Sequence, residues 1–249
     1  MTSSLLLALL ASVAPLAAAH GHVTGIVAAG KYFTGYTPNF QYMNPKPKVP
    51  AWSAGGYGQG GIVADAYNKI DIVCHDNAKP GEAYATVPAG SKIDIQWSPW
   101  AESHHGPVMD YLAPCPGDCL TLRDGSGLKF TKIAESGLIT PGPPSSYVWA
   151  TDVMRKRNNT WSVTIPAGLK EGNYVLRNEI IALHTAGTVG GAQNYPQCFN
   201  VKVTGGGGKG LPGGGGAMQL YKPEAKGIVF NIAANVASYP IPGPPVWKG

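Results

Sequence analysis

Three stretches of the chain, residues 92–97, 161–165 and 199–204, alternate apolar and polar side chains. A period of two is typical of a strand that buries one face, so each stretch predicts a half-buried β-strand. Residues 174–183 are rich in β-branched and apolar side chains and predict a further strand. Residues 152–157 favour one short helical turn.

Glycine and proline separate these predicted strands. Residues 205–216 form a glycine-rich loop, GGGGKGLPGGGG, and the strand-like residues 228–232 follow it closely. The loop is too short and too close to later strand-like residues to be a convincing domain linker. No internal repeat or separate binding module is evident. The pattern therefore predicts an all-β protein, an antiparallel β-sandwich with long loops, in one domain.

Composition supports this fold class. The 249 residues include 34 Gly and 22 Pro, the two poorest helix formers, which argues against a helical bundle. The hydrophobic share of 44% with only 13% charged residues argues against a disordered chain. A net charge of +5 is spread along the chain, and its longest basic run is residues 155–157. We therefore expect no nucleic-acid partner, since that needs a concentrated basic stripe.

The first 19 residues read MTSSLLLALLASVAPLAAA and predict a secretory signal peptide. Leu5–Leu10 form the apolar core, and Ala17 and Ala19 fit an A-x-A cleavage site, although no positive charge precedes the core. A membrane anchor is the alternative, but the apolar stretch is short and Pro15 breaks it. We expect cleavage before His20, which leaves residues 20–249 as a secreted, extracellular domain without a membrane partner.

Secretion changes the interpretation of the four cysteines, because an oxidising compartment favours disulfides over zinc. Three pairings of Cys74, Cys115, Cys119 and Cys198 are possible. The spacing of Cys115 and Cys119 suits a local loop bridge, and this leaves Cys74 with Cys198. A structural zinc site is the alternative.

One glycosylation sequon is present at Asn158-Asn159-Thr160. It makes Asn158 a candidate glycan site on an exposed loop.

The histidines carry the candidate chemistry: His20, His22, His75, His104, His105 and His184. A histidine at a processed N-terminus is unusual, because its α-amine and its ring Nδ1 can bind one metal together. The amine has a reference pKa of about 8, so it becomes a good ligand near neutral pH. A ring nitrogen from a second histidine would complete three nitrogen ligands in a T shape. That arrangement suits tetragonal copper(II) better than tetrahedral zinc.

The second histidine is expected within residues 100–107, WAESHHGP. Adjacent residues of an extended segment point in opposite directions, so only one of His104 and His105 can easily be a ligand. Sequence geometry alone does not choose between them.

Four segments together resemble the fungal lytic polysaccharide monooxygenases of auxiliary-activity family nine, formerly glycoside hydrolase family sixty-one. They are the start HGHVTGIVAAGKYFTGY, then QWSPWAESHHGPVMDYLAPCPGDC, NYVLRNEIIALH and GAQNYPQC. The resemblance covers essentially the whole chain after residue 19, down to SYPIPGPPVW.

This resemblance implies a role for five residues. His20 would bind copper through its amine and ring nitrogen, and His104 would supply the third nitrogen. Tyr195 would occupy a long axial position on the copper. His184 and Gln193 would lie behind these ligands and hydrogen-bond oxygen species at the metal.

The resemblance also implies the fold, the partners and the reaction. The fold would be an immunoglobulin-like sandwich with copper on a flat face, and the bridges would be Cys74–Cys198 and Cys115–Cys119. The copper, reduced by a small reductant or a redox enzyme, would use O2 or H2O2 to cleave cellulose or another β-glucan oxidatively. Tyr42 and Tyr221 resemble positions that stack on sugar rings in the family. We expect a monomer.

Two other function classes remain alternatives. A glycoside hydrolase needs two positioned carboxylates, and no pair stands out among the 14 acidic residues. A non-catalytic polysaccharide-binding protein would keep the aromatic side chains and lack copper activity. His22 is expected at the surface, His75 in a structural role, and His105 packed or hydrogen-bonded behind the site.

Overall fold

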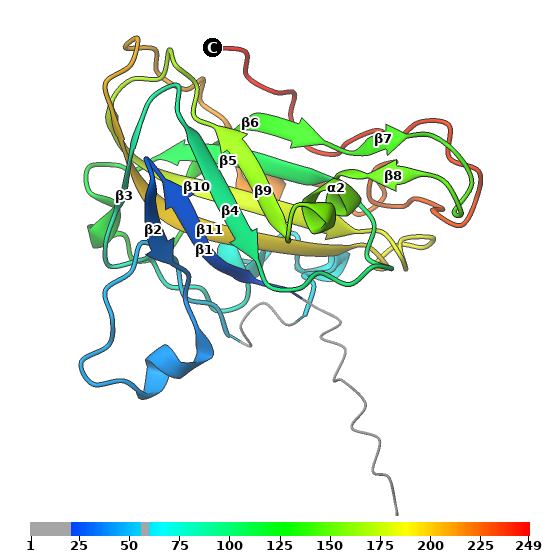
Figure 1. The fold of residues 1–249 in the computed structure, drawn as a ribbon, viewed down its shortest axis with the longest axis horizontal. Helices are drawn as coiled ribbons and strands as arrows, with labels where there is room; N and C mark the ends of the chain where they lie inside the picture. Colours follow the sequence, from blue (N-terminus) through cyan, green and yellow to red (C-terminus); the bar gives the residue numbers. More distant parts are fainter. Residues whose placement is uncertain (1–20, 56–59) are drawn as a thin grey trace, which may run out of the picture.

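A computed structural model describes residues 21–55 and 60–249, which form a β-sandwich. The predicted signal peptide, and His20 with it, lie outside the described residues. Figure 1 shows β4 (Lys92–Trp97) and β9 (Thr160–Thr164) crossing over β5 (Val108–Pro114) and β10 (Gly172–Ala182). These strands belong to two different sheets, so the two layers face each other across the core.

One layer is a four-stranded antiparallel sheet in the order β2-β1-β4-β9. Its remaining strands are β1 (Val23–Ala28) and β2 (Lys31–Thr34). The other layer is a six-stranded sheet in the order β12-β6-β5-β10-β11-β3, antiparallel except for the parallel pair of β11 and β3. Its further strands are β3 (Ala85–Pro88), β6 (Lys129–Ser136), β11 (Gln193–Thr204) and β12 (Gly215–Gly216).

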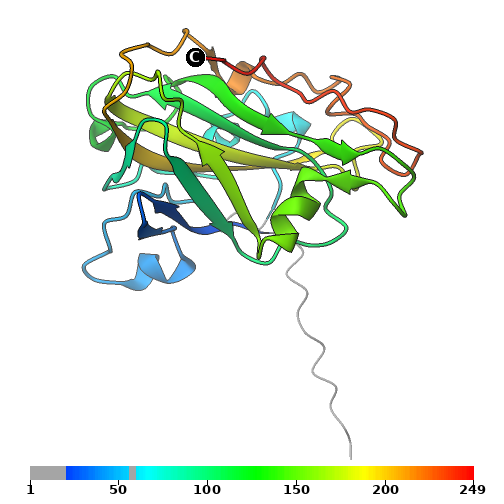
Figure 2. The ribbon, with the colours of Figure 1, turned by 45° about the horizontal axis from the view of Figure 1, so that its top comes forward.

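The remaining elements are short and lie in the loops. A two-stranded ribbon consists of β7 (Leu138–Thr140) and β8 (Val148–Trp149), and α2 (Ala150–Lys156) lies between that ribbon and β9 (Figure 2). The others are α1 (Asp71–Cys74) and the 3₁₀ turns η1 (Pro38–Tyr42), η3 (Ala64–Ala66), η4 (Cys119–Thr121) and η5 (Ala217–Gln219). The described part of the chain contains no helix with the length and apolar character needed to cross a lipid bilayer.

The strand predictions are confirmed at β4, β9, β10 and β11, and the helical turn is confirmed as α2. The strand-like interpretation of residues 228–232 is wrong, because these residues form turns. Ile228 and Ile232 are nevertheless buried. They cover the outer face of the six-stranded sheet as loop residues, and burial without ladder pairing explains their apolar character.

Strand β10 carries buried apolar side chains on both sides, on either side of the buried polar residues Arg177, Asn178 and Glu179. Leu176 and Ile180 point into the core between the two sheets, whereas Val175 and Ile181 point to a second core beneath the loops. Side chains of a strand alternate between faces, so a strand covered on both sides shows a nearly continuous apolar run. The loop after β10, which carries His184, contributes Leu183 and Ala186 to this second core.

The disulfides are confirmed as Cys74–Cys198 and Cys115–Cys119, and the described residues contain no free cysteine. The alternative of a cysteine-bound structural zinc is therefore wrong. The long bridge spans 124 residues and ties α1 to β11. It holds the loop before β3 against the strand that carries Gln193 and Tyr195.

A buried carboxyl group links the two sheets through hydrogen bonds. Asp110 on β5 is fully buried and accepts from Trp161 Nε1 at 2.8 Å and from Asn178 Nδ2 at 2.7 Å. Asn178 in turn accepts from Trp97 Nε1 at 3.0 Å. Burial raises the pKa of Asp110 from 3.8 to about 6, although the two hydrogen bonds oppose the shift. Unlike most carboxyl groups of folded proteins, this one therefore binds its proton more tightly when the chain is folded.

We expect Asp110 to make the protein less stable as the pH rises from about 4 to 6. Its pKa is raised on folding, so the stabilisation is complete below the unfolded value of 3.8 and is lost as the pH rises through about 6. The shift corresponds to roughly 3 kcal/mol at most. The measurement is the free energy of unfolding from pH 4 to 7 for the native protein and for Asp110→Asn. As the pH rises, the free energy of unfolding of the native protein should fall relative to that of Asp110→Asn. Parallel curves would contradict the prediction.

Candidate metal centre

His104 lies in the loop between β4 and β5 and is buried. Its backbone is fixed from two directions, because its N–H donates to Ala101 O at 3.1 Å and its carbonyl accepts from Trp100 Nε1 at 2.8 Å. The indole of Trp100 also stands edge-on to the His104 ring, with 5.9 Å between ring centroids. His104 is thus held by a local turn and by an aromatic neighbour four residues earlier.

Two other predicted site residues lie against the same two rings. The ring of His184 stacks on that of His104 with 3.8 Å between centroids and an interplanar angle of 26°. Tyr195 stands edge-on to Trp100 at 5.0 Å, and its hydroxyl donates to Gln193 Oε1 at 2.7 Å. His184 lies two residues after the end of β10, and Gln193 and Tyr195 lie at the start of β11. The antiparallel pair of β10 and β11 therefore brings these three residues to one end of the sheet.

Trp100 was not singled out from the sequence, yet it contacts both His104 and Tyr195. It also packs against Gly21, where a Cβ atom would come within 2.8 Å of Trp100 Cε3. Only a residue without a side chain allows this approach. Gly21 follows His20 in the sequence, so the chain enters the described structure at the edge of this cluster. The sequence signal that could have identified Trp100 is its position four residues before the candidate ligand His104.

His105 points away from this cluster, as the alternation of an extended segment requires. Its Nδ1 donates to both carboxylate oxygens of Asp152, at 3.0 and 3.1 Å, and its ring packs edge-on against Tyr147 with 5.0 Å between centroids. Burial would raise the pKa of Asp152, but the hydrogen bonds from His105 and from the backbone of Trp149 outweigh it and lower the pKa. The expectation that His105 is packed or hydrogen-bonded is confirmed, since its ring packs on Tyr147 and bonds to Asp152.

The donor atoms fit a copper ion. Ser103 Oγ lies 3.1 Å from Nδ1 of His104, and an Nδ1–H···O bond there places the ring's lone pair on Nε2. Burial raises the pKa of Tyr195 far above its usual value of 10, so the phenol is neutral at physiological pH. A neutral phenol oxygen is a weak, distant ligand, whereas a neutral imidazole is a strong one. Imidazole nitrogen with a weak axial oxygen is a set that copper accepts.

These described donors do not complete a metal site by themselves. Among residues 21–55 and 60–249, no three His, Cys, Asp or Glu side chains are arranged to hold a metal ion. The predicted ligand set needs His20 for two of its three nitrogens, and His20 lies outside the described residues. Its role as a ligand stays a prediction.

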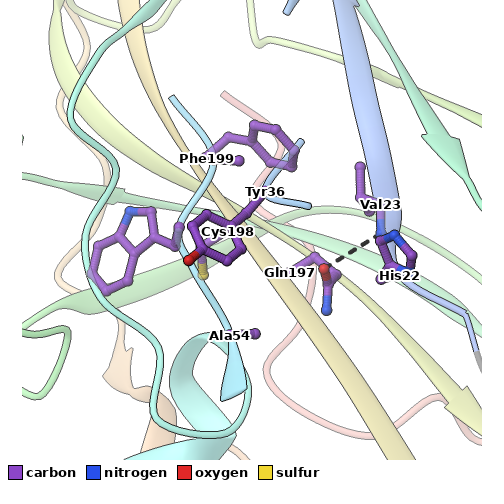
Figure 3. A pocket seen from close by; sticks show the side chains of 9 residues that line it. His22, Val23, Tyr36, Ala54, Gln197, Cys198 and Phe199 are labelled. Atoms are coloured by element: carbon purple, nitrogen blue, oxygen red, sulfur yellow. Dashed lines mark hydrogen bonds between the residues drawn. The ribbon is translucent and has the colours of Figure 1, made fainter. Parts of the chain in front are cut away.

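His22 lies near the surface beside a small pocket between β1 and β11 (Figure 3). Its backbone N–H donates to Ser98 Oγ at 3.1 Å, and burial lowers the pKa of its ring. Val23 N donates to Gln197 Oε1 at 3.4 Å across the same pocket. The cavity of about 10 Å³ has room for no more than one water molecule. His22 itself is partly exposed, and the contacts described here do not join it to the cluster around His104.

His75 packs behind Tyr195, with 6.3 Å between the ring centroids. It is buried, and its Nδ1 accepts from the backbone N–H of Asp76 at 2.9 Å. Its φ of +84° is strained for a residue with a side chain. The prediction that His75 is structural is confirmed, and the structure adds that it supports Tyr195.

The two tyrosines predicted to contact substrate differ in exposure. Tyr42 ends η1 and is 82% exposed, which leaves its ring accessible. Tyr221 is 7% exposed, and its hydroxyl bonds to Tyr111 and Glu179. The prediction for Tyr221 is wrong, because an aromatic ring enclosed in the second core cannot stack on a polysaccharide. Its position in a loop suggested exposure, but the loop folds back onto the six-stranded sheet.

The glycosylation sequon lies in the turn between α2 and β9. Asn158 is exposed, and both it and Asn159 adopt positive φ angles of 54° and 56°. Asparagine tolerates that conformation better than other residues with a side chain. The Oδ1 atom of Asn159 accepts from the backbone of Trp100 at 3.0 Å. The same turn therefore presents a candidate glycan site and supports the loop that carries His104.

Comparison with known proteins relates this chain to one protein family. The profile of Auxiliary Activity family 9, formerly GH61, matches residues 20–239. The match begins at the residue that the expected cleavage would leave at the N-terminus.

Two curated relatives cover nearly the whole chain. AA9 family lytic polysaccharide monooxygenase B of Aspergillus fumigatus is 52% identical over 242 residues, which cover 96% of this chain and 95% of the relative. AA9 family lytic polysaccharide monooxygenase A of Thermoascus aurantiacus is 49% identical over 231 residues, which cover 92% of this chain and 100% of the relative.

Solved structures show the same fold. The extended catalytic domain of LPMO9A from H. jecorina aligns with a TM-score of 0.87 at 46% identity, covering 92% of both chains. Cel61B from Hypocrea jecorina, described as a glycoside hydrolase family 61 member, aligns with a TM-score of 0.85 at 42% identity. It covers 92% of this chain and 100% of that chain.

Proposed function

The chain belongs to Auxiliary Activity family 9, and from this membership and the site geometry we propose that it is a secreted, copper-dependent lytic polysaccharide monooxygenase. Its substrate is a β-1,4-linked glucan, cellulose or a hemicellulose, which it cleaves oxidatively with an external electron donor. The observation that carries the proposal is that Trp100 contacts His104, Tyr195 and Gly21, while His184 stacks on His104.

Three residues hold the copper in this proposal. His20 supplies its α-amine and a ring nitrogen, and His104 supplies the third nitrogen. Tyr195 would lie beside the copper as a neutral phenol, because burial raises the pKa of its hydroxyl. Such a phenol would limit access to the metal without adding charge. When bound and reduced by the donor, copper supplies the activation of O2 or H2O2 that removes a hydrogen atom from a glycosidic carbon.

Gln193 and His184 organise the space next to the ligands. The side-chain carbonyl of Gln193 accepts a hydrogen bond from the Tyr195 hydroxyl at 2.7 Å, so its amide nitrogen is oriented away from Tyr195 as a donor. The backbone of Gly61 packs on Gln193, since a Cβ there would lie 2.3 Å from Gln193 Cβ, and this contact limits its movement. His184 is held by its stacking on His104. Both side chains would donate or accept hydrogen bonds to an oxygen co-substrate.

An uncharged polymer is met by stacking and hydrogen bonds rather than by ion pairs. Tyr42 offers an exposed ring on η1, which projects from the sandwich in Figure 1. We assign it to substrate binding. Secretion follows from the predicted signal peptide, and the two disulfides support it. Asn158 is proposed to carry a glycan, and the protein is proposed to act as a monomer.

Product analysis tests the proposed function. Secreted protein with His20 at its N-terminus is loaded with copper and incubated with cellulose, with and without ascorbate. We expect oxidised oligosaccharides, identified by mass spectrometry, only when copper and the reductant are both present. Cellulose without protein and protein stripped of copper by a chelator are the controls.

Two other outcomes would contradict the proposal. Unoxidised reducing sugars released without a reductant would indicate hydrolysis, for which a pair of positioned carboxylates is required. Binding to cellulose with no released sugar would indicate a non-catalytic polysaccharide-binding protein.

A further inference from the structure

The first turn of α2 forms hydrogen bonds with the backbone two residues after His104. Thr151 Oγ1 accepts from the backbone N–H of Gly106 at 3.0 Å, and Thr151 N donates back to Gly106 O at 3.3 Å. Thr151 is buried, and so is Gly106. A reciprocal pair of hydrogen bonds in a buried setting fixes this part of the loop closely, because neither group can exchange its partner for water.

A second contact presses the same segment against β10. A Cβ atom on Gly106 would lie 1.8 Å from the carbonyl oxygen of Ile181, so only glycine fits here. The next backbone bond runs from Leu183 N to His105 O at 2.9 Å. The loop is therefore clamped between α2 and the end of β10, directly before His184. This clamp fixes the backbone next to both His104 and His184.

Asp152 holds the residue between His104 and Gly106. Its two oxygens lie 3.0 and 3.1 Å from Nδ1 of His105, and one of them also accepts from Trp149 N at 2.9 Å. The carboxylate is thus anchored to its own helix while it holds the His105 ring. Since the side chains of successive extended residues point to opposite sides, fixing the direction of the His105 ring also fixes the direction of the His104 ring.

We propose that Thr151 and Asp152 are positioning residues for the His104 imidazole, acting through Gly106 and His105 respectively. The inference rests on the proposed role of His104 as a copper ligand. Neither residue belongs to the ligand set implied by the family. They set the angle at which His104 presents Nε2 to the metal.

The loop before His104 is held by other groups, which makes the two positioning residues separable. The backbone N–H of Trp100 donates to Asn159 Oδ1, and its indole N–H donates to the carbonyl of His104. Loss of the contacts from α2 should leave these bonds in place. The expected defect is a misdirected His104 ring in a loop that still folds.

The test compares conservative and disruptive changes at both positions. Thr151→Val removes the hydroxyl that accepts from Gly106 and keeps the branched shape, whereas Thr151→Ser keeps the hydroxyl. Asp152→Asn keeps the shape and weakens the bond to His105. Asp124→Asn is the matched control, because Asp124 accepts from Ser126 N at 2.9 Å and from its hydroxyl in an exposed turn. All variants are prepared with His20 at the N-terminus.

Three quantities are measured for each variant: copper(II) affinity, the electron paramagnetic resonance spectrum of bound copper(II), and the melting temperature without metal. We expect Thr151→Val and Asp152→Asn to lower copper affinity by about tenfold, the low end for groups that orient metal-bound histidines. Their spectra should show changed g and hyperfine values. Thr151→Ser and Asp124→Asn should match the native protein in affinity and spectrum.

The results separate this inference from the proposed function. Unchanged affinity and spectra in Thr151→Val and Asp152→Asn, even with a lower melting temperature, would show that the two residues serve only folding and would overturn the inference. His104→Ala is the reference variant, and we expect it to lose tight copper binding. If His104→Ala kept native affinity, the proposed ligand assignment itself would fail.

Discussion

Adding one glycine before His20 is expected to abolish tight copper binding. The extension converts the α-amine of His20 into an amide, whose nitrogen can bind copper only after losing its proton, and it breaks the chelate that the His20 amine forms with its own ring. The expected loss is more than about 100-fold, beyond what changes in the groups surrounding the ligands cause. Titration of the two proteins with copper(II), followed by tryptophan fluorescence, measures it. Gly21 lies against the buried indole of Trp100, which makes fluorescence a suitable reporter.

The matching variants test the histidine pair. His104→Ala should reproduce the loss of binding seen with the extended protein. His105→Ala should retain a copper complex, because the His105 ring bonds to Asp152 on the opposite side of the loop. Equal affinity for the native and the extended protein would refute the chelate, and tight binding by His104→Ala with none by His105→Ala would exchange the two assignments.

Replacing Glu179 by leucine is expected to destabilise the folded protein by about 3–5 kcal/mol, the usual result of removing one partner from a buried ion pair. Arg177 and Glu179 are both fully buried, and two hydrogen bonds of 2.7 and 2.9 Å join them. Arg177 also donates to the carbonyls of Ile72 and Val73 at 2.8 Å. Without Glu179 the guanidinium would remain charged in an apolar environment, because its pKa is too high for it to release a proton.

Denaturant unfolding with intact disulfides measures this effect. Glu102→Leu is the control, because Glu102 pairs with Arg155 at 3.4 Å but its side chain is 84% exposed. Exposed pairs contribute about 0–1 kcal/mol, so the control should unfold almost like the native protein. The double variant Arg177→Leu/Glu179→Leu should recover part of the loss by removing the isolated charge. A change below about 1 kcal/mol in Glu179→Leu would mean that the pair does not stabilise the fold.

The regular part of the fold was predictable because its signals are local. The alternation at residues 92–97 reports burial on one side of a strand, and that strand pairs with β1 and β9 as an interior member of its sheet. The close spacing of Cys115 and Cys119 indicated a local bridge for a similar reason, since a short loop favours their meeting. The irregular residues 228–232 misled the same reasoning, because a buried loop and a strand share apolar composition.

The directions of loop side chains were not predictable, because distant elements decide them. Tyr221 and Tyr42 both lie in segments that look like surface loops, but only Tyr221 folds beneath the sheet, where it bonds to Tyr111 and Glu179. Asp152 carried no signal in the sequence at all. Its relation to His105 spans 47 residues and exists only once α2 is packed on the loop.

The sequence by itself determined the all-β class, the disulfide chemistry and the expectation that processing would create a metal-binding histidine. These follow from residue types and spacings that act over a few positions. Only the tertiary structure decided that His104, and not His105, packs against Trp100 and His184. The physical reason is that one peptide unit reverses the direction of a side chain. Contacts from α2 and from the end of β10, far away along the chain, fix the orientation of that unit.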